Sequence, residues 1–142
     1  MMAFFSSVML TNLSLIELKH LVNPDCTMDK GTVSFNHELT FRVRSDISQE
    51  DMKDVGMIAI INLEGVNENN ERVFHIVANY DAEFHLIDNK DFFLANTDEQ
   101  SHYCFTLMYP YILSDFLNIL KSAGFEGVSL PLSVHPKDMV KL

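Results

Sequence analysis

The stretch from residue 97 to residue 122 carries the feature that most constrains how this chain can fold. Its large apolar side chains recur around nearly the whole circumference of the helix that the pattern predicts. Only a narrow stripe is polar, and it consists of Ser114, Asp115, Asn118, Lys121 and Ser122. A helix that covers one face of a sheet needs a single apolar stripe. We therefore expect its second side to be covered by more of this chain, another copy of it, or a bound polypeptide.

A second copy of the chain is the favoured cover, because little sequence follows Gly124. We therefore predict a homo-oligomer, built most simply from an isologous pair. The alternative is a helix that is buried in the core of a monomer. The helix residues expected at the interface between copies are Leu107, Ile112, Phe116 and Leu120.

Signals for both ends of this helix are present. Thr97 and Gln100 have the spacing of a capping box at its start. Lys121 and Gly124 are typical of a last-turn cation and of a left-handed cap at its end. The helix would be about 26 residues long. Pro110 lies inside it and is expected to kink or interrupt it.

The earlier part of the chain is rich in predicted strands. Residues 33–44 alternate cleanly, as in a half-buried antiparallel strand with one solvated face. The apolar face of that strand consists of Val33, Phe35, His37, Leu39, Phe41 and Val43. Residues 13–22 alternate more weakly and are interpreted as a first strand. Residues 55–63 are apolar on both faces and are interpreted as a central strand.

Residues 72–86 form the predicted fourth strand, after a turn that is rich in asparagine. This segment exceeds the usual strand length, which predicts a bulge or bend near Tyr80 and Asp81. Residues 88–96 are expected to form a loop. Strands followed by a helical last third indicate an α+β chain, with a single domain over residues 1–142.

Charge narrows the classes of partner. The chain has 20 acidic against 10 basic residues, so its formal net charge is −10. Nucleic-acid binding depends on basic side chains that neutralise phosphates, and no basic cluster exists beyond Arg42 and Arg44. We therefore expect neither nucleic acid nor an anionic membrane surface as a partner. No membrane insertion is expected either, since no apolar run reaches the roughly 20 residues of a spanning helix.

The cysteine content and the start of the chain bear on its compartment. Cys26 and Cys104 are too few for a disulfide framework and are typical of reduced thiols. Residues 1–10 are apolar but lack the basic region of a signal peptide. We therefore expect a cytoplasmic protein.

A search for catalytic and cofactor motifs finds no glycine-rich phosphate loop, no C-x-x-C and no H-E-x-x-H. His102 and Cys104 are two residues apart on the predicted helix and do not face each other, so Cys104 is interpreted as a small buried residue. His37 and His75 could meet across neighbouring strands, but a zinc site needs three or four ligands. We predict no catalytic residue, no metal and no cofactor.

Aromatic side chains gather in residues 88–96 and in the helix, and eight methionines accompany them across the chain. Aromatic rings and flexible thioethers suit promiscuous apolar binding. The residues expected to line an apolar groove are Phe84, Phe92, Phe93, Tyr103, Tyr109 and Tyr111. The alternative is that such rings fill the core or an oligomer interface, as we expect for Phe105 and Phe116.

The order of these elements, together with several short motifs, is similar to a known family. The motifs are the step Tyr109-Pro110-Tyr111 in the long helix, then Gly124-Phe125, then Leu130-Pro131, and the fourth-strand stretch from Val77 through Phe84 to Leu86. In this order they resemble SecB, the bacterial protein-export chaperone family. The resemblance covers roughly residues 13–131.

The resemblance implies a four-stranded antiparallel sheet with a long, Pro-interrupted helix packed on one side. It also implies dimers that pair into tetramers through that helix. Its functional implication is a non-enzymatic, ATP-independent holdase, whose apolar groove binds unfolded or preprotein polypeptides. An export motor or an antitoxin would be a further partner.

The chain departs from the family at identifiable positions. Ala82 and Glu83 stand where paired glycines are expected, and Ile112 follows the Pro-Tyr step where a basic residue is usual. The chain stops at Leu142, which leaves no room for a full second helix. These departures make a relative with another client, such as an antitoxin, as admissible as a protein of the export pathway.

Two other interpretations remain open. One is a structural or adaptor oligomer of the same fold without client binding, which predicts a filled groove around Phe92, Phe93 and Tyr111. The other is a small-molecule-binding or hydrolytic α+β domain. That interpretation predicts a closed pocket with convergent polar groups and a perturbed acid or histidine.

Overall fold

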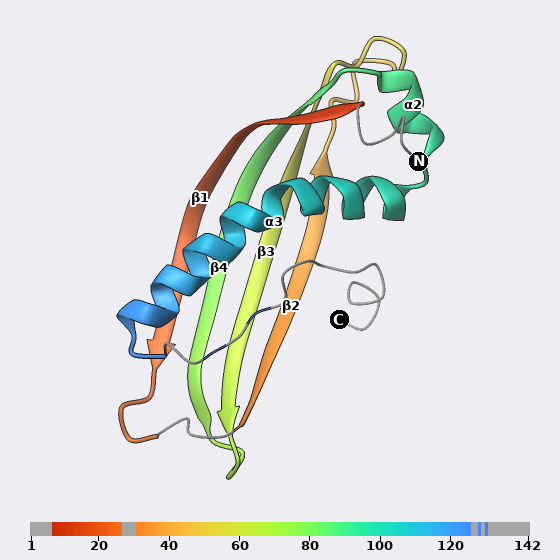
Figure 1. Cartoon of the computed structure of the whole chain (residues 1–142). Coiled ribbons are helices and arrows are strands. Elements are labelled where there is room, and N and C mark those ends of the chain that lie inside the picture. Colours follow the sequence, from red (N-terminus) through yellow and green to blue (C-terminus); the bar gives the residue numbers. More distant parts are fainter. Residues whose placement is uncertain (1–6, 27–30, 126–127, 129, 131–142) are drawn as a thin grey trace.

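A computed structural model describes residues 7–26, 31–125, 128 and 130 of the chain. Its strands are β1 (Val8–Val22), β2 (Gly31–Arg42), β3 (Asp54–Asn67) and β4 (Arg72–Leu86), and its helices are α2 (Asn89–Leu94) and α3 (Thr97–Ser122). The strands form one four-stranded sheet in the order β1-β4-β3-β2, and every neighbouring pair is antiparallel. The helix α3 crosses one face of this sheet diagonally, and α2 lies at one end of it (Figure 1).

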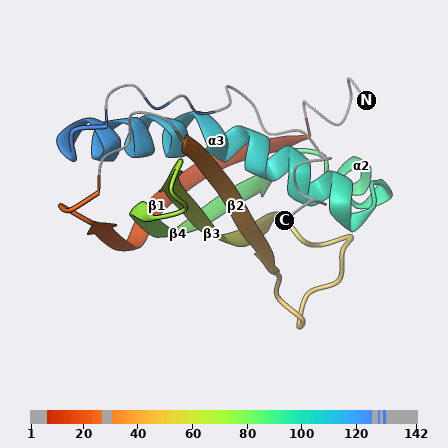
Figure 2. The same ribbon diagram turned by 90° about the horizontal axis from the view of Figure 1, so that it is seen from below.

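This architecture confirms the predicted fold class, an antiparallel four-stranded sheet with a long helix on one side. The view along the sheet makes the two layers plain (Figure 2). The fourth strand has the predicted limits, and α3 has the predicted length of 26 residues. The first and third strands are longer than predicted. Pro131 of the Leu130-Pro131 motif and the chain end at Leu142 lie outside the described residues.

The bulge predicted in the fourth strand near Tyr80 and Asp81 is wrong, because the extra residues there belong to the strand beside it. β4 has an extra residue of its own at Val73, where its register with β3 shifts between Gly65 and Val66. The register between β1 and β4 shifts between Leu10 and Asn12, and again between Leu15 and Glu17. Thr11 and Ile16 are therefore the additional residues, and both are in β1. Bulges occur preferentially on edge strands, where one side of the backbone is free to bend. The second shift lies opposite Tyr80, so the sequence predicted the position of a bulge correctly but assigned it to the wrong strand.

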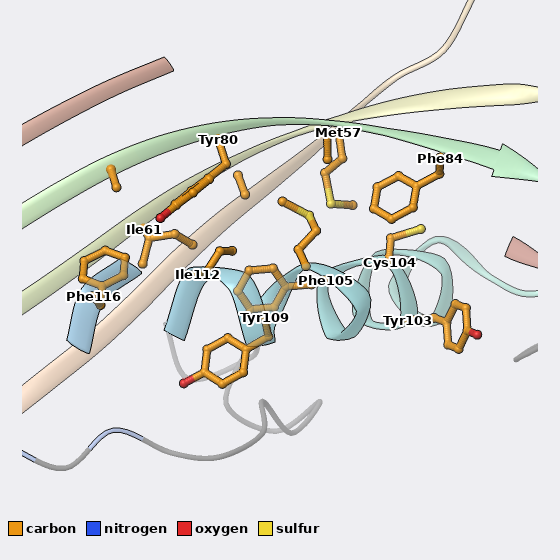
Figure 3. Close-up of a cluster of buried hydrophobic side chains, with 14 of the residues drawn as sticks. Met57, Ile61, Tyr80, Phe84, Tyr103, Cys104, Phe105, Tyr109, Ile112 and Phe116 are labelled. Carbon is orange, nitrogen blue, oxygen red and sulfur yellow. The ribbon is translucent and has the colours of Figure 1, made fainter. Parts of the chain in front are cut away.

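The core lies between α3 and one face of the sheet (Figure 3). On β3 and β4, alternate side chains are fully buried against the helix, as the period of two in a strand requires. The buried residues of α3 are Tyr103, Cys104, Phe105, Met108, Tyr109, Ile112, Phe116 and Leu120. The helix is therefore anchored along its whole length by one apolar face.

Residues 88–96 contain a short helix rather than the predicted loop. The carboxylate of Asp88 accepts a hydrogen bond from the backbone N–H of Asp91, which caps α2. The predicted capping box at Thr97 is also wrong. Asn96 is the N-cap of α3, and its side-chain oxygen accepts from the N–H of Glu99 at 2.8 Å. The amide of Gln100 instead donates to the carbonyls of Phe92 and Ala95, which joins the two helices.

The helix α3 continues through Pro110 to Ser122, so the predicted interruption is wrong, whereas the kink that was its alternative stays a prediction. Proline costs an interior helix position a hydrogen bond and a steric clash. Pro110 is exposed, however, so water can solvate the carbonyl that lacks its partner. Buried side chains on both sides of it, Tyr109 and Ile112 among them, hold the helix against the sheet.

Candidate functional site

The structure separates the aromatic residues that the sequence analysis assigned to a groove. Phe84, Phe92, Tyr103 and Tyr109 are buried in the core of the chain. Phe93 is half-buried, and Tyr111 is 60% exposed. Tyr111 lies in the middle of α3, whereas Phe93 belongs to α2. These residues therefore do not form one continuous groove, and the two accessible rings lie in two different places.

The first place is the end of the sheet beside α2. Two cavities, of about 450 Å³ and about 490 Å³, lie here and share Phe93 and Gln49. The larger cavity has apolar walls from the end of β2, the start of β3 and α2. Those walls include Phe41, Val43, Val55, Phe92 and Phe93. Leu94 lines the smaller one and is 78% exposed.

The connector between β2 and β3 is held against α2 by one side chain. The amide nitrogen of Asn89 lies 2.8–3.0 Å from the backbone oxygens of Gln49, Glu50 and Met52. Three backbone carbonyls of the connector are thereby bonded to α2. The rings of Phe92 and Phe93 line the larger cavity beside it. We define the α2 surface as Val43, Phe93, Leu94 and the cavity walls around them.

Sequence reasoning missed two members of the α2 surface. Val43 was assigned to the buried face of the second strand by alternation, but β2 ends at Arg42 and Val43 is exposed. Leu94 was placed in a loop. A signal was available, since Asp88 precedes an apolar run with N-cap chemistry, and a helix there would have separated the directions of Phe92, Phe93 and Leu94.

The second place is a cavity of about 430 Å³ between β1 and α3. Its walls include Thr11 and Asn12 from β1, Tyr80 from β4, and Tyr111 and Asp115 from α3. The hydroxyl of Tyr80 donates to the carboxylate of Asp115 at 2.8 Å. Burial of the phenol, and then this carboxylate, raise the pKa of Tyr80 far above its usual value. Tyr80 therefore remains a hydrogen-bond donor at every physiological pH.

An apolar strip lies along the β1 edge of the sheet. Apolar side chains of β1 are exposed on both of its faces, and Leu117 of α3 is exposed as well. We define the β1 strip as Leu15, Ile16, Leu18, Leu21 and Leu117. In the described part of the chain, β1 pairs with β4 only, so its other edge presents unpaired backbone groups. Such an edge is a template for pairing with another strand.

The residues of the long helix that were predicted to form an oligomer interface do not belong to the β1 strip. Ile112 and Phe116 are fully buried against the chain's own sheet (Figure 3). Leu120 is buried as well, and Leu107 is half-buried. The sheet of the same chain therefore supplies most of the cover that these helix residues need. The rings of Phe35 and Phe116 pack edge to face at 6.4 Å, which illustrates how β2 covers this side.

The burial of Cys104 and the positions of His37 and His75 bear on the hypotheses of a catalytic thiol and of a metal site. Burial raises the pKa of the Cys104 thiol to about 12, so this residue does not provide a thiolate at neutral pH. His37 of β2 is stacked on Phe105 beneath α3, whereas His75 contacts Asn62 on the opposite face of the sheet. β3 also separates their strands, so the idea that they could meet is wrong. Across the described residues, no group of three potential ligands could hold a metal ion.

A helix that crosses a bilayer needs about 20 consecutive, predominantly apolar residues. Neither α2 nor α3, the helices of the described residues, is long and apolar enough to span one.

Comparison with solved structures identifies a similar fold. The chain is similar to the SecB-like chaperone Rv1957 of Mycobacterium tuberculosis, solved in complex with a ChAD peptide from the Rv1956 HigA1 antitoxin. The TM-score is 0.66 at 13% sequence identity, over 92% of this chain and 94% of the other. No protein-family model and no curated protein sequence matches the chain. The fold is therefore SecB-like, as the resemblance implied, and at this identity the comparison establishes the fold alone.

Proposed function

We propose that this protein is a non-enzymatic, ATP-independent chaperone of the holdase type, which binds unfolded polypeptide at the α2 surface. The observation that carries this proposal is a pair of adjoining cavities that share the ring of Phe93: the larger has apolar walls that include Phe41 and Val43, and the exposed Leu94 lines the smaller. The similarity to a chaperone solved with an antitoxin peptide supports a polypeptide as the ligand class. An antitoxin segment and an exported preprotein would both supply the apolar side chains that this surface requires.

The mechanism is reversible burial of apolar side chains. An unfolded segment that places a large apolar side chain against Phe93 and Val43 removes that surface from water, at about 25 cal/mol for each Å². The amide group of Gln49, the Asn96 amide nitrogen and the Gln100 amide oxygen are not used by the hydrogen bonds described above, and they can hydrogen-bond the extended backbone of the segment. Release requires no chemical step, because the contacts are individually weak. A bound segment cannot join an aggregate while its apolar side chains are occupied.

The proposal includes assembly of the chain into a homo-oligomer, a homodimer or homotetramer, through the β1 strip. The strip combines exposed apolar side chains with an unpaired strand edge, which a second copy can satisfy by antiparallel pairing. This replaces the buried helix residues as the proposed interface. The net charge of −10 keeps copies with exposed apolar surface from associating without order.

The first experiment is aggregation of a urea-unfolded client on dilution, followed by light scattering without nucleotide, together with chromatography of the mixture. The protein is expected to suppress aggregation and to co-elute with the client. Phe93→Ser and Leu94→Ser should each weaken client capture several-fold, since each removes apolar surface from the rim. Because Phe93 packs on Phe92 at 5.1 Å, thermal unfolding of its variant must be measured in parallel.

The matched control is Ile87→Ser. Ile87 is 60% exposed, lies near α2 in sequence, and is absent from the walls of both cavities. Its replacement should leave client capture unchanged. A wild-type protein that ignores the client would refute the proposed function. Equal losses from all three variants would instead place the binding surface elsewhere.

A further inference from the structure

The two cavities of the α2 surface have two side chains in common, and these come from different walls. Gln49 belongs to the connector between β2 and β3, residues 43–53, whereas Phe93 belongs to α2. The width of both cavities therefore depends on how far the connector lies from α2. A side chain that fixes this separation shapes both cavities at once.

The side chain that spans this separation is Asn89, the first residue of α2. Its amide nitrogen lies 3.0 Å from the carbonyl oxygen of Gln49, 2.8 Å from that of Glu50 and 3.0 Å from that of Met52. Carbonyl oxygens only accept hydrogen bonds, so a donor must face them, and an amide nitrogen supplies two N–H groups. Phe93 follows Asn89 by four residues, which places both on the same face of α2. Asn89 therefore holds the connector opposite the ring of Phe93.

The end of the connector that leads into β3 has anchors of its own. Met52 is buried in the core, and the carbonyl of Lys53 accepts from the N–H of Leu86 at 2.7 Å. These contacts join the connector to the sheet and do not involve α2. Loss of the Asn89 amide would therefore leave the sheet in place and would free the middle of the connector, which carries Gln49.

We infer that Asn89 is the positioning residue of the α2 surface, and that its amide keeps the two walls at the separation at which one apolar side chain contacts both. This inference rests on the proposed function and adds to it a residue that acts through Gln49 and Phe93. The physical reason is preorganisation, because a segment that is ordered before binding does not have to be ordered by the ligand. A connector without this tie would lower the affinity for every client.

The test begins with Asn89→Asp, which keeps the shape of the side chain and replaces its two donors by acceptors. The carboxylate would face three carbonyl oxygens and repel them, so the connector should move away from α2. The probe is a fluorescein-labelled peptide of fifteen residues, with two phenylalanines on a background of alanine and serine, in an anisotropy titration. At pH 7.5 the variant should bind this peptide about tenfold more weakly than the wild type.

A pH profile separates a positioning role from general damage to the fold. The carbonyl oxygens favour the protonated acid and raise the pKa of the introduced carboxyl group. Once protonated, that group donates a hydrogen bond again, so the ratio of variant to wild-type affinity should return toward one between pH 7.5 and pH 5. The neighbouring charged side chains are the same in both proteins; they are Glu50, Asp88 and Lys90. Asn89→Ala removes the donors without adding a charge and should bind about threefold more weakly at both pH values.

The matched control is Asn62→Asp, which makes the same change on β3. Asn62 is half-buried and contacts His75 on the face of the sheet that lies opposite α3. This variant should keep the wild-type affinity for the peptide at both pH values. Thermal unfolding of every variant at both pH values verifies that each is folded in the titration.

The outcomes distinguish this inference from the function on which it rests. A wild-type protein that does not bind the peptide would refute the proposed function itself. Wild-type affinity in Asn89→Ala would overturn the positioning role and leave the proposed function standing. A loss in Asn89→Asp that is equal at pH 7.5 and pH 5 would also overturn it, because the missing donor would then not be the cause.

Discussion

At the scale of single residues, two glycines of β3 make room for different neighbours and therefore have different roles. A Cβ atom at Gly65 would lie 2.2 Å from Cε2 of Phe74, inside the core. A Cβ atom at Gly56 would lie 2.9 Å from Nη2 of Arg42, which is the mobile end of a long side chain. Arg42 crosses Gly56 to pair with Asp81 and Glu83 of β4. One glycine therefore accommodates a buried ring and the other accommodates a surface ion pair.

We predict that Gly65→Ala lowers the free energy of unfolding by about 1–3 kcal/mol, because the ring of Phe74 must leave its place in a packed core. Gly56→Ala should cost less than about 1 kcal/mol, since Arg42 can swing aside and surface ion pairs contribute little. Urea unfolding at a fixed protein concentration measures both. Adding Phe74→Leu to Gly65→Ala should recover part of the loss. Equal costs at the two glycines would contradict this account.

At the scale of elements, the junction between α2 and α3 sets the geometry of the α2 surface. Asn96 caps α3, and Gln100 reaches back to the carbonyls of Phe92 and Ala95. The two helices are therefore fixed at an angle by hydrogen bonds as well as by the buried Phe92. Phe93 and Leu94 are presented to solvent because this angle is fixed.

The cap assignment leads to a prediction that separates two adjacent residues. Asn96→Ala should lower the free energy of unfolding by about 1 kcal/mol, the usual value of an N-cap. Thr97→Ala should change it by less than about 0.5 kcal/mol, because Thr97 already lies inside the helix and alanine has the higher helix propensity. Urea unfolding with far-ultraviolet circular dichroism checks both variants. A larger loss at Thr97 would restore the capping box read from the sequence.

At the scale of the whole molecule, two apolar surfaces of the described residues lie apart from each other. The α2 surface lies at one end of the sheet, and the β1 strip lies along one edge (Figure 1). An assembly through the edge would leave the end free. The proposed binding and the proposed assembly can therefore be altered independently of each other.

We predict that Ile16→Lys and Leu21→Lys, each placed on the β1 strip, convert the oligomer to a monomer. Ile16 is 57% exposed and Leu21 is 66% exposed in the isolated chain, so neither change disrupts its core. A lysine on an edge strand opposes pairing through its charge and its hydration. Light scattering coupled to size-exclusion chromatography gives the mass. Leu94→Lys is the control and should retain the mass of the wild type, whereas a monomeric wild type would refute the assembly.

Much of the fold could be predicted from the sequence, because local periodicity reports it. The alternation in residues 33–44 and the apolar pattern of residues 97–122 each correspond to an observed element, and the limits of the fourth strand are correct. The errors lie at junctions. The bulge near Tyr80 was assigned to β4 instead of β1, since the sequence of one strand does not reveal which of two paired strands carries the extra residue.

The candidate site was only partly predictable, and neighbouring aromatic residues give the physical reason. Phe92 and Phe93 are identical and adjacent, yet one is buried and the other lines a cavity. Consecutive residues on a helix point about 100° apart, so the direction of α2 alone separates them. Likewise, Tyr80 and Asp115 are 35 positions apart and meet only because α3 crosses β4. The sequence by itself determined which segments are strands and which is the long helix, because spacing along the chain encodes periodicity. Only the tertiary structure decided which rings and which carboxylate face a cavity, because that depends on the packing of distant elements.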